Sequence, residues 1–140
     1  MKKLLIILLL PLSVFSQSRK SQIDSAVVIM HQLVNEYRIE NRLDTLELSD
    51  DLTKKAQAHA EWMYYNKYEH SLTAKQEGLA ENCLEAAPYD FYFKMSTRHW
   101  VNADLNLWKN SPGHNSNLLE IRISKFGFGT YKGYSVQLFK

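Results

Sequence analysis

The chain has 140 residues, which predicts a single domain, and 45% of them are hydrophobic, an ordinary share for a globular protein. Lysine and arginine number 17 against 15 acidic residues, and without Lys2 and Lys3, which we expect to be removed, the two counts are equal. Such a neutral domain lacks the basic surface of a protein that binds nucleic acid or an anionic membrane. Cys83 is the single cysteine, which excludes an intramolecular disulfide and a cysteine-based zinc site.

Residues 1–16 are typical of a secretory signal peptide. Two lysines precede the apolar run Leu4–Phe15, which is about half the length that a membrane-spanning helix needs. Small residues before the junction favour cleavage after Ser16. We therefore expect export to the periplasm or the extracellular space and no stable membrane span after cleavage; an uncleaved anchor is the alternative.

The first half of the mature chain shows a helical pattern. After a polar lead at residues 17–25, apolar residues recur at spacings of four and three at Ile23, Val27, Met30, Val34 and Tyr37. Ser49 is placed to cap a second helix that ends near Asn66. The predicted buried stripe of this helix is Leu52, Ala56, Ala60 and Met63.

The second half mixes strands and helices. Helical periodicity is lost over residues 67–88, where Leu79–Ala87 reads as a strand. Asp90–Trp108 predicts a third helical segment, and Ser111 followed by Pro112 predicts a short helix that ends near Leu119. The chain closes with a predicted hairpin, Lys125–Tyr131 and Tyr134–Phe139 joined by Lys132-Gly133. The fold class is therefore α+β, with helices packed on a small sheet.

Three polar residues are candidates for chemistry: His70, Glu81 and His114. A carboxylate on a half-buried strand costs free energy unless it is paired or faces a wet groove. His114 falls in the first turn of the predicted short helix, where the positive end of the helix dipole favours a neutral imidazole. Neutral imidazole is the form that binds a metal or accepts a proton. The spacing of the three matches no compact metal motif.

Other candidate residues have simpler readings. His59 lies beside the buried stripe of the second helix, so we expect a packed, hydrogen-bonded histidine. Cys83 is flanked by apolar residues and is expected to be buried, although a reactive thiol is the alternative. An aromatic cluster belongs either to a ligand groove or to the core: Tyr89, Phe91, Tyr92 and Phe93.

Segments in a fixed order resemble the CAP superfamily, also called the SCP domain, which includes cysteine-rich secretory proteins, venom antigens and pathogenesis-related proteins. The resemblance covers roughly residues 26–139 and makes 26–140 the predicted CAP/SCP domain. The matching residues are Leu33-Val34-Asn35-Glu36-Tyr37-Arg38, Asn41, Leu46, Leu48-Ser49, Leu52, Ala56, His59-Ala60, Met63, His70-Ser71, Glu81-Asn82, Trp108, Ser111-Pro112-Gly113-His114, Asn117-Leu118-Leu119, Phe126-Gly127-Phe128-Gly129 and Val136-Gln137-Leu138-Phe139.

The resemblance implies an α-β-α sandwich, with helices on a small, mainly antiparallel sheet and a central groove that presents histidines and glutamates. His70, Glu81 and His114 fall on three of those positions. In the family the histidines can hold a divalent metal, commonly zinc, and the glutamates orient or assist them. With His70 and His114 as its protein ligands, Zn²⁺ or another divalent cation would bind weakly, because zinc sites usually have three or four protein ligands.

The sequence departs from the family pattern in three places. Animal and plant members carry a second glutamate where this chain has Ser111, and the Ser-Pro-Gly-His arrangement resembles short bacterial members. The usual glycine before Glu81 is Ala80. The disulfides of eukaryotic members are absent, so packing alone must hold the core.

Three functions remain open from the sequence. The first is an exported monomer that binds a peptide, lipid or glycan in a groove lined by His70, Glu81 and His114, with or without a metal. The second is a metal-assisted peptidase or esterase with Glu81 as general base. The third is an interaction scaffold with a vestigial site. The lack of a recognisable nucleophile, base and orienting group favours a binding protein over an enzyme.

Overall fold

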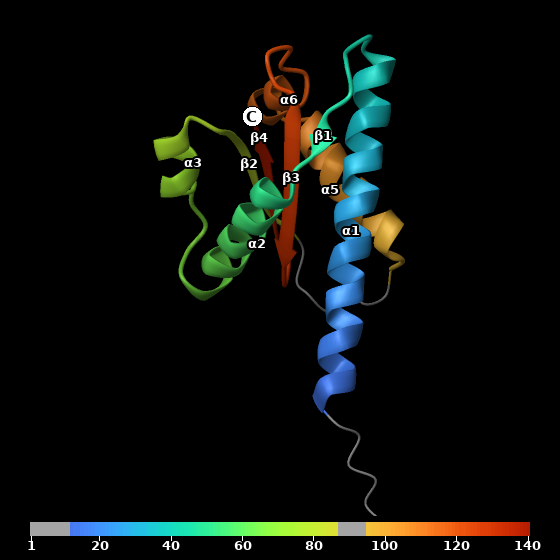
Figure 1. The fold of residues 1–140 in the computed structure, drawn as a ribbon, viewed down its shortest axis with the longest axis vertical. Coiled ribbons are helices and arrows are strands. Elements are labelled where there is room, and N and C mark those ends of the chain that lie inside the picture. The colour runs from blue at the N-terminus through green and yellow to red at the C-terminus, as the bar shows by residue number, and fades with distance from the viewer. Residues whose placement is uncertain (1–11, 87–94) are drawn as a thin grey trace, which may run out of the picture.

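A computed structural model describes residues 12–86 and 95–140 (Figure 1). Along the chain its elements are α1 (Leu12–Glu40), β1 (Glu47–Leu48), α2 (Asp50–Tyr65), α3 (Leu72–Glu77), β2 (Ala80–Glu85), α5 (Thr97–Lys109), α6 (Pro112–Leu118), β3 (Lys125–Tyr131) and β4 (Tyr134–Phe139). In the part of the chain that is described, no helix is long and apolar enough to cross a membrane.

The four strands form one sheet between two helical layers. The strand order is β1-β3-β4-β2, with β1 parallel to β3 and the other pairs antiparallel. Helix α2 covers one face, and α1 and α5 cover the other (Figure 1). Each face has its own apolar core, one built on Met30, Trp108 and Phe128 and the other on Ala56, Ala60 and Val136. The predicted α-β-α sandwich with a mainly antiparallel sheet is confirmed.

Helix α2 forms as its sequence predicts. The Ser49 hydroxyl accepts a hydrogen bond from the backbone N–H of Leu52, and the helix ends at Asn66. The predicted stripe is the buried one: Leu52, Ala56, Ala60 and Met63. The helix lies so close to β3 that a Cβ atom on Gly129 would come within 2.1 Å of the Gln57 backbone nitrogen. Glycine is therefore required where the helix crosses the strand.

The terminal hairpin is also confirmed, with the predicted bounds. Lys132 and Gly133 both have positive φ, 45° and 91°, as the two central residues of a type I′ turn do. Because this turn matches the twist of the strands it joins, it fixes the register in which Tyr131 pairs with Tyr134.

The structure departs from the sequence-based expectations at α1, β1 and α3, and it describes two further predicted segments only in part or not at all. Helix α1 begins at Leu12, so the predicted polar lead at residues 17–25 is helical. The short elements β1 and α3 were not predicted, because two and six residues are too few to show a period. Within the predicted segment Asp90–Trp108, α5 begins at Thr97. The aromatic cluster at residues 89–93 lies outside the described residues.

Candidate functional site

His70 and Glu81 form a hydrogen-bonded pair at the edge of the sheet. His70 precedes the Ser71 cap of α3, and Glu81 lies on β2. His70 Nδ1 lies 2.8 Å from Glu81 Oε2, which also accepts the Ser71 backbone N–H at 2.9 Å. The Glu81 side chain is only 5% exposed, whereas that of His70 is 67% exposed. A carboxylate can only accept here, so Nδ1 carries a proton, and in the neutral ring the lone pair is on Nε2.

His114 lies in the first turn of α6 and is half-buried. Its pKa is lowered from the usual value, first by burial and then by the nearby charge of His70. This direction agrees with the neutral form expected from the sequence, and its causes are burial and the charge of His70. The interaction with His70 also places the two imidazoles in one region of the surface.

Two buried asparagine contacts connect α6 to β2 and so bring His114 toward Glu81. Asn82 Nδ2 donates to the His114 carbonyl at 3.1 Å, and Asn117 Nδ2 donates to Asn82 Oδ1 at 2.9 Å. Asn82 also donates to Gln137 Oε1 at 3.0 Å. Both asparagines lie inside the segments that resemble the family, but no sequence pattern marks their amides as part of the site.

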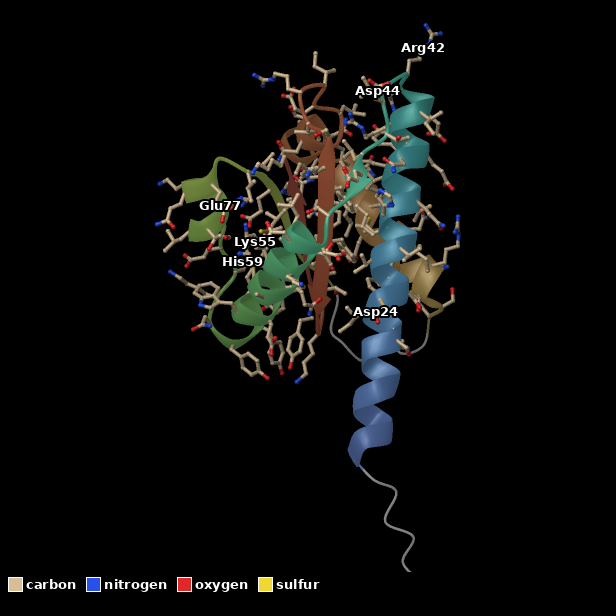
Figure 2. All side chains as sticks on the ribbon, viewed as in Figure 1. Asp24, Arg42, Asp44, Lys55, His59 and Glu77 are labelled. Atoms are coloured by element: carbon tan, nitrogen blue, oxygen red, sulfur yellow. The ribbon has the colours of Figure 1, made fainter. Side chains whose placement is uncertain are left out.

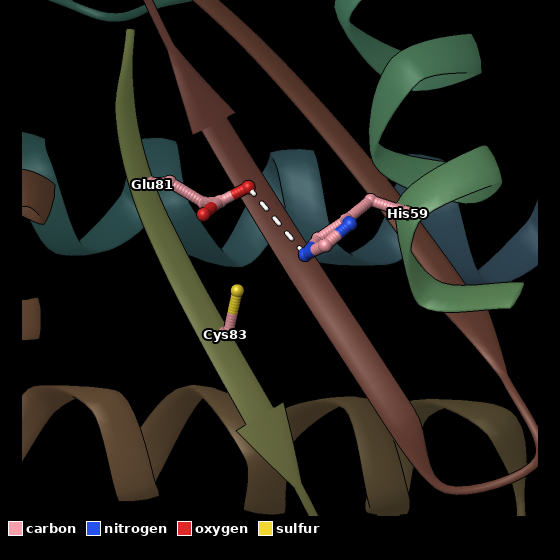
Figure 3. Close-up of side chains that lie close together, drawn as sticks. All are labelled: His59, Glu81 and Cys83. Carbon is pink, nitrogen blue, oxygen red and sulfur yellow. Dashed lines mark ion pairs between the residues drawn. The ribbon is translucent and has the colours of Figure 1, made fainter. Parts of the chain in front are cut away.

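Behind Glu81 the structure adds His59 and Cys83, whose ligand atoms lie with those of Glu81 within 4.8 Å of one another (Figure 3). His59 comes from α2 and reaches between the helix and β2, with Nε2 at 4.0 Å from Glu81 Oε1 (Figures 2 and 3). Cys83 Sγ lies 3.8 Å from His70 Nδ1. The sequence assigned neither residue to the site, because His59 and Cys83 match no spaced ligand motif.

The chemistry of this cluster favours a supporting role over a metal centre. His59 Nε2 donates to the Glu69 carbonyl at 2.8 Å, and a protonated nitrogen has no lone pair for a metal. Burial and the charge of Glu81 raise the pKa of the Cys83 thiol, so the thiol stays protonated. The packed, hydrogen-bonded His59 and the buried Cys83 are thus confirmed.

The exposed face of the site offers two imidazoles, His70 and His114. Glu81 stands behind His70, where it fixes the ring and its tautomer, as carboxylates do for metal-bound histidines. The Ser71 hydroxyl caps α3 by accepting from the Ala74 N–H at 3.0 Å, the ordinary role of a serine at a helix start. The arrangement can therefore present imidazole lone pairs to a cation or to a hydrogen-bond donor of a ligand.

Comparison with solved structures finds the same fold in bacterial proteins. An extracellular protein from Bacillus anthracis that contains an SCP domain matches with a TM-score of 0.66 and 23% identity over 84% of this chain. A cysteine-rich secretory protein from Staphylococcus aureus matches with a TM-score of 0.65 and 19% sequence identity over 84% of this chain. The matches cover 40% and 38% of those longer chains. An outer surface protein from Borrelia burgdorferi matches with a TM-score of 0.61 and 23% sequence identity. This match covers 79% of this chain and 88% of the Borrelia chain.

At these identities the structural likeness shows the fold alone, and a comparison with curated proteins finds no significant match. The sequence itself matches the model of the cysteine-rich secretory protein family over residues 31–139, from the middle of α1 to the end of β4. This match covers most of the chain and includes every residue of the site described above. The chain belongs to the cysteine-rich secretory protein (CAP) family.

Proposed function

We propose that this chain is an exported binding protein whose ligand site is built on His70 and His114, with Glu81 as the group that orients His70. The observation that carries the proposal is the 2.8 Å contact between His70 Nδ1 and Glu81 Oε2. It joins a buried carboxylate to an exposed ring and leaves the outer nitrogen of that ring available. The ligand is a peptide, a lipid or a glycan.

A divalent cation such as Zn²⁺ fits the two imidazoles. Neutral imidazole is the form that binds metal, which the lowered pKa of His114 favours, and the carboxylate behind His70 orients that ring and raises its basicity as a ligand. With only two protein ligands the affinity is modest, and the remaining coordination positions belong to water or to the bound ligand.

A metal-assisted hydrolase would use Glu81 as general base. Such a base must come within hydrogen-bond reach of a bound water. Glu81 Oε2 already accepts from His70 and Ser71, and the side chain is 5% exposed, which favours the orienting role over proton abstraction. The binding function therefore has the stronger support, and an interaction scaffold with a vestigial site is the remaining alternative.

Export is part of the proposal. The lysines and apolar run at residues 1–16 support removal of a signal peptide after Ser16. The structural neighbours from Bacillus and Borrelia are described as extracellular and outer-surface proteins, which supports a location outside the cytoplasm for this chain as well.

Calorimetric titration of the purified exported protein with Zn²⁺ tests the metal site. We expect wild type and His99→Ala to bind equally, because His99 is an exposed histidine on α5, and the double variant His70→Ala/His114→Ala to lose binding. Equal binding by the double variant and wild type removes the metal role.

A screen of the same protein against peptide and ester substrates separates binding from catalysis. Turnover that disappears in Glu81→Gln would establish the hydrolase, and the absence of turnover together with a ligand that co-purifies in mass spectrometry supports the binding protein. A ligand that still co-purifies with the double variant would place its site elsewhere.

A further inference from the structure

Exposed aromatic side chains from the end of α2 gather with the half-buried Tyr131 at the β3–β4 hairpin. We call Trp62, Tyr64, Tyr65, Tyr131 and Lys132 the aromatic rim. Tyr65 is 65% exposed, and Trp62 and Tyr64 are each 39% exposed. Their exposure is not required by the core, which α2 already covers with the opposite face of the helix.

The aromatic rim is a connected structure. The rings of Tyr64 and Tyr131 lie 5.3 Å apart edge to face, and the hydroxyls of Tyr65 and Tyr131 lie 3.0 Å apart. Lys132 Nζ lies 4.4 Å above the Tyr64 ring and donates to its hydroxyl at 3.2 Å. These contacts hold the Tyr64, Tyr65 and Tyr131 rings in place before any partner arrives, so less ordering entropy is lost on binding. Trp62 is held separately, by stacking on His59 at 5.7 Å between ring centroids.

The aromatic rim lies at the end of the molecule from which α1 starts. In Figure 1 the last turn of α2, the β3–β4 hairpin and the first turns of α1 all point toward the lower end, whereas the loop between α6 and β3 lies at the upper end. Helix α1, which begins at Leu12, starts at this same end.

We propose that the aromatic rim is a membrane-contact surface that rests in the headgroup region of a lipid bilayer. Tyrosine and tryptophan combine an apolar ring with a polar tip, and both are enriched where a membrane meets water. A lysine at the same level extends its apolar stem along the rings and keeps its ammonium in water. The surface is separate from the His70 and His114 site and does not depend on the function proposed for that site.

The charge of the chain selects the kind of membrane. Acidic and basic residues balance outside the first three residues, and Lys132 is the single cation of the aromatic rim. Binding therefore depends on the interfacial chemistry of the rings and needs no anionic lipid. It differs in this from a basic amphipathic surface, whose binding falls steeply as salt is added.

Co-sedimentation with vesicles tests the proposal on the purified exported protein. We expect binding to phosphatidylcholine vesicles that is unchanged by added phosphatidylglycerol or salt. Tyr64→Ser/Tyr65→Ser is expected to lose this binding. Ile121→Ser is the matched control, because Ile121 is 75% exposed on the loop at the opposite end, and it is expected to bind as wild type does.

A second readout remains informative if the tyrosine variant folds poorly or if the N-terminal segment is retained. Lipids brominated in the acyl chain quench tryptophan that reaches the bilayer. The difference between wild type and Trp62→Phe is expected to show quenching of Trp62. No quenching of Trp62, or equal vesicle binding by the well-folded tyrosine variant, overturns the proposal. Retention on insoluble glycan without vesicle binding would also overturn it and assign the aromatic rim to sugars.

Discussion

Glu81 holds the candidate site together at the level of single residues. One carboxylate oxygen, Oε2, accepts from both His70 and Ser71, while the other, Oε1, is buried without a hydrogen-bond partner among the described residues and lies 4.0 Å from His59 Nε2. A buried carboxylate with a partly unsatisfied oxygen is costly, so its presence points to a role beyond packing. The residue orients the exposed imidazole and leaves the neighbouring serine to its capping role.

Glu81→Gln is expected to weaken Zn²⁺ binding about 10–100-fold, because the amide is a poorer acceptor and no longer raises the basicity of His70. The measurement is a calorimetric titration at fixed pH. Glu85→Gln, on the same strand but exposed, is the control and should bind as wild type. An unchanged affinity in Glu81→Gln would mean that the carboxylate does not act through His70.

At the level of elements, two short helices, α3 and α6, flank the site. Both have a serine at the N-cap position, but only one of the two serines makes a capping hydrogen bond. Ser71 caps α3 through a hydrogen bond from the Ala74 N–H, whereas Ser111 stands at the cap position of α6 without a side-chain bond. The predicted helix start at Ser111 and Pro112 is thus correct in place, and the capping hydrogen bond expected of Ser111 is absent.

Ser71→Ala is expected to lower the free energy of unfolding by about 1 kcal/mol, the usual cost of a lost capping bond, and to speed amide exchange at Ala74. Ser111→Ala should change stability far less. Both values come from urea unfolding, and equal losses in the two variants would contradict the assignment of the cap to Ser71.

The contact between α2 and β3 gives a second prediction at this scale. Gly129→Ala places a methyl group against the backbone of Ala56 and Gln57, so the helix must move away from the sheet. We expect a loss of about 3 kcal/mol in the free energy of unfolding.

Gly113→Ala is the control for this change, because nothing lies within 4 Å of the added Cβ atom and the residue is helical. It should leave stability unchanged or raise it by up to about 1 kcal/mol. A tolerated Gly129→Ala would mean that α2 does not approach β3 as closely as described.

For the whole molecule, burial of Cys83 makes stability depend on alkaline pH. Burial raises the pKa of its thiol above the ordinary value of 9.0, and burial likewise raises the pKa of Tyr68 above 10.0. Above pH 9.0 the unfolded chain releases the thiol proton while the folded chain keeps it. The folded state then binds more protons, so stability falls as pH rises.

We therefore expect the free energy of unfolding of wild type to fall between pH 9 and 10 more steeply than that of Cys83→Ala, by up to about 1.4 kcal/mol per pH unit. Urea unfolding at a series of pH values measures both slopes. Parallel slopes would show that the thiol already meets water in the folded state.

Much of the architecture follows from local sequence. The buried stripe of α2, its Ser49 cap and the hairpin at Lys132-Gly133 were predictable because period, capping and turn chemistry act over a few residues. The family motif also placed His70, Glu81 and His114 in a common groove, and the hydrogen bond of His70 and the lowered pKa of His114 agree with that placement.

Tertiary structure alone decided which groups meet across long stretches of chain. Arg38 is buried and donates to the carbonyls of Asp44, Leu118 and Glu120. The two-residue β1 exists only because β3 pairs with it. Neither contact leaves a periodic signal, because each depends on where distant backbone arrives after packing.

The distance along the chain over which an interaction acts separates what this sequence determined from what it did not. By itself it determined the longer helices, the hairpin, the family and the polar residues that could carry function, since these depend on patterns of neighbours. The fold decided that Glu81 lies behind His70 with His59 and Cys83 beside it, and that tyrosines from α2 and β3 share one end of the molecule. Burial and proximity are properties of packed surfaces, and only the assembled layers create them.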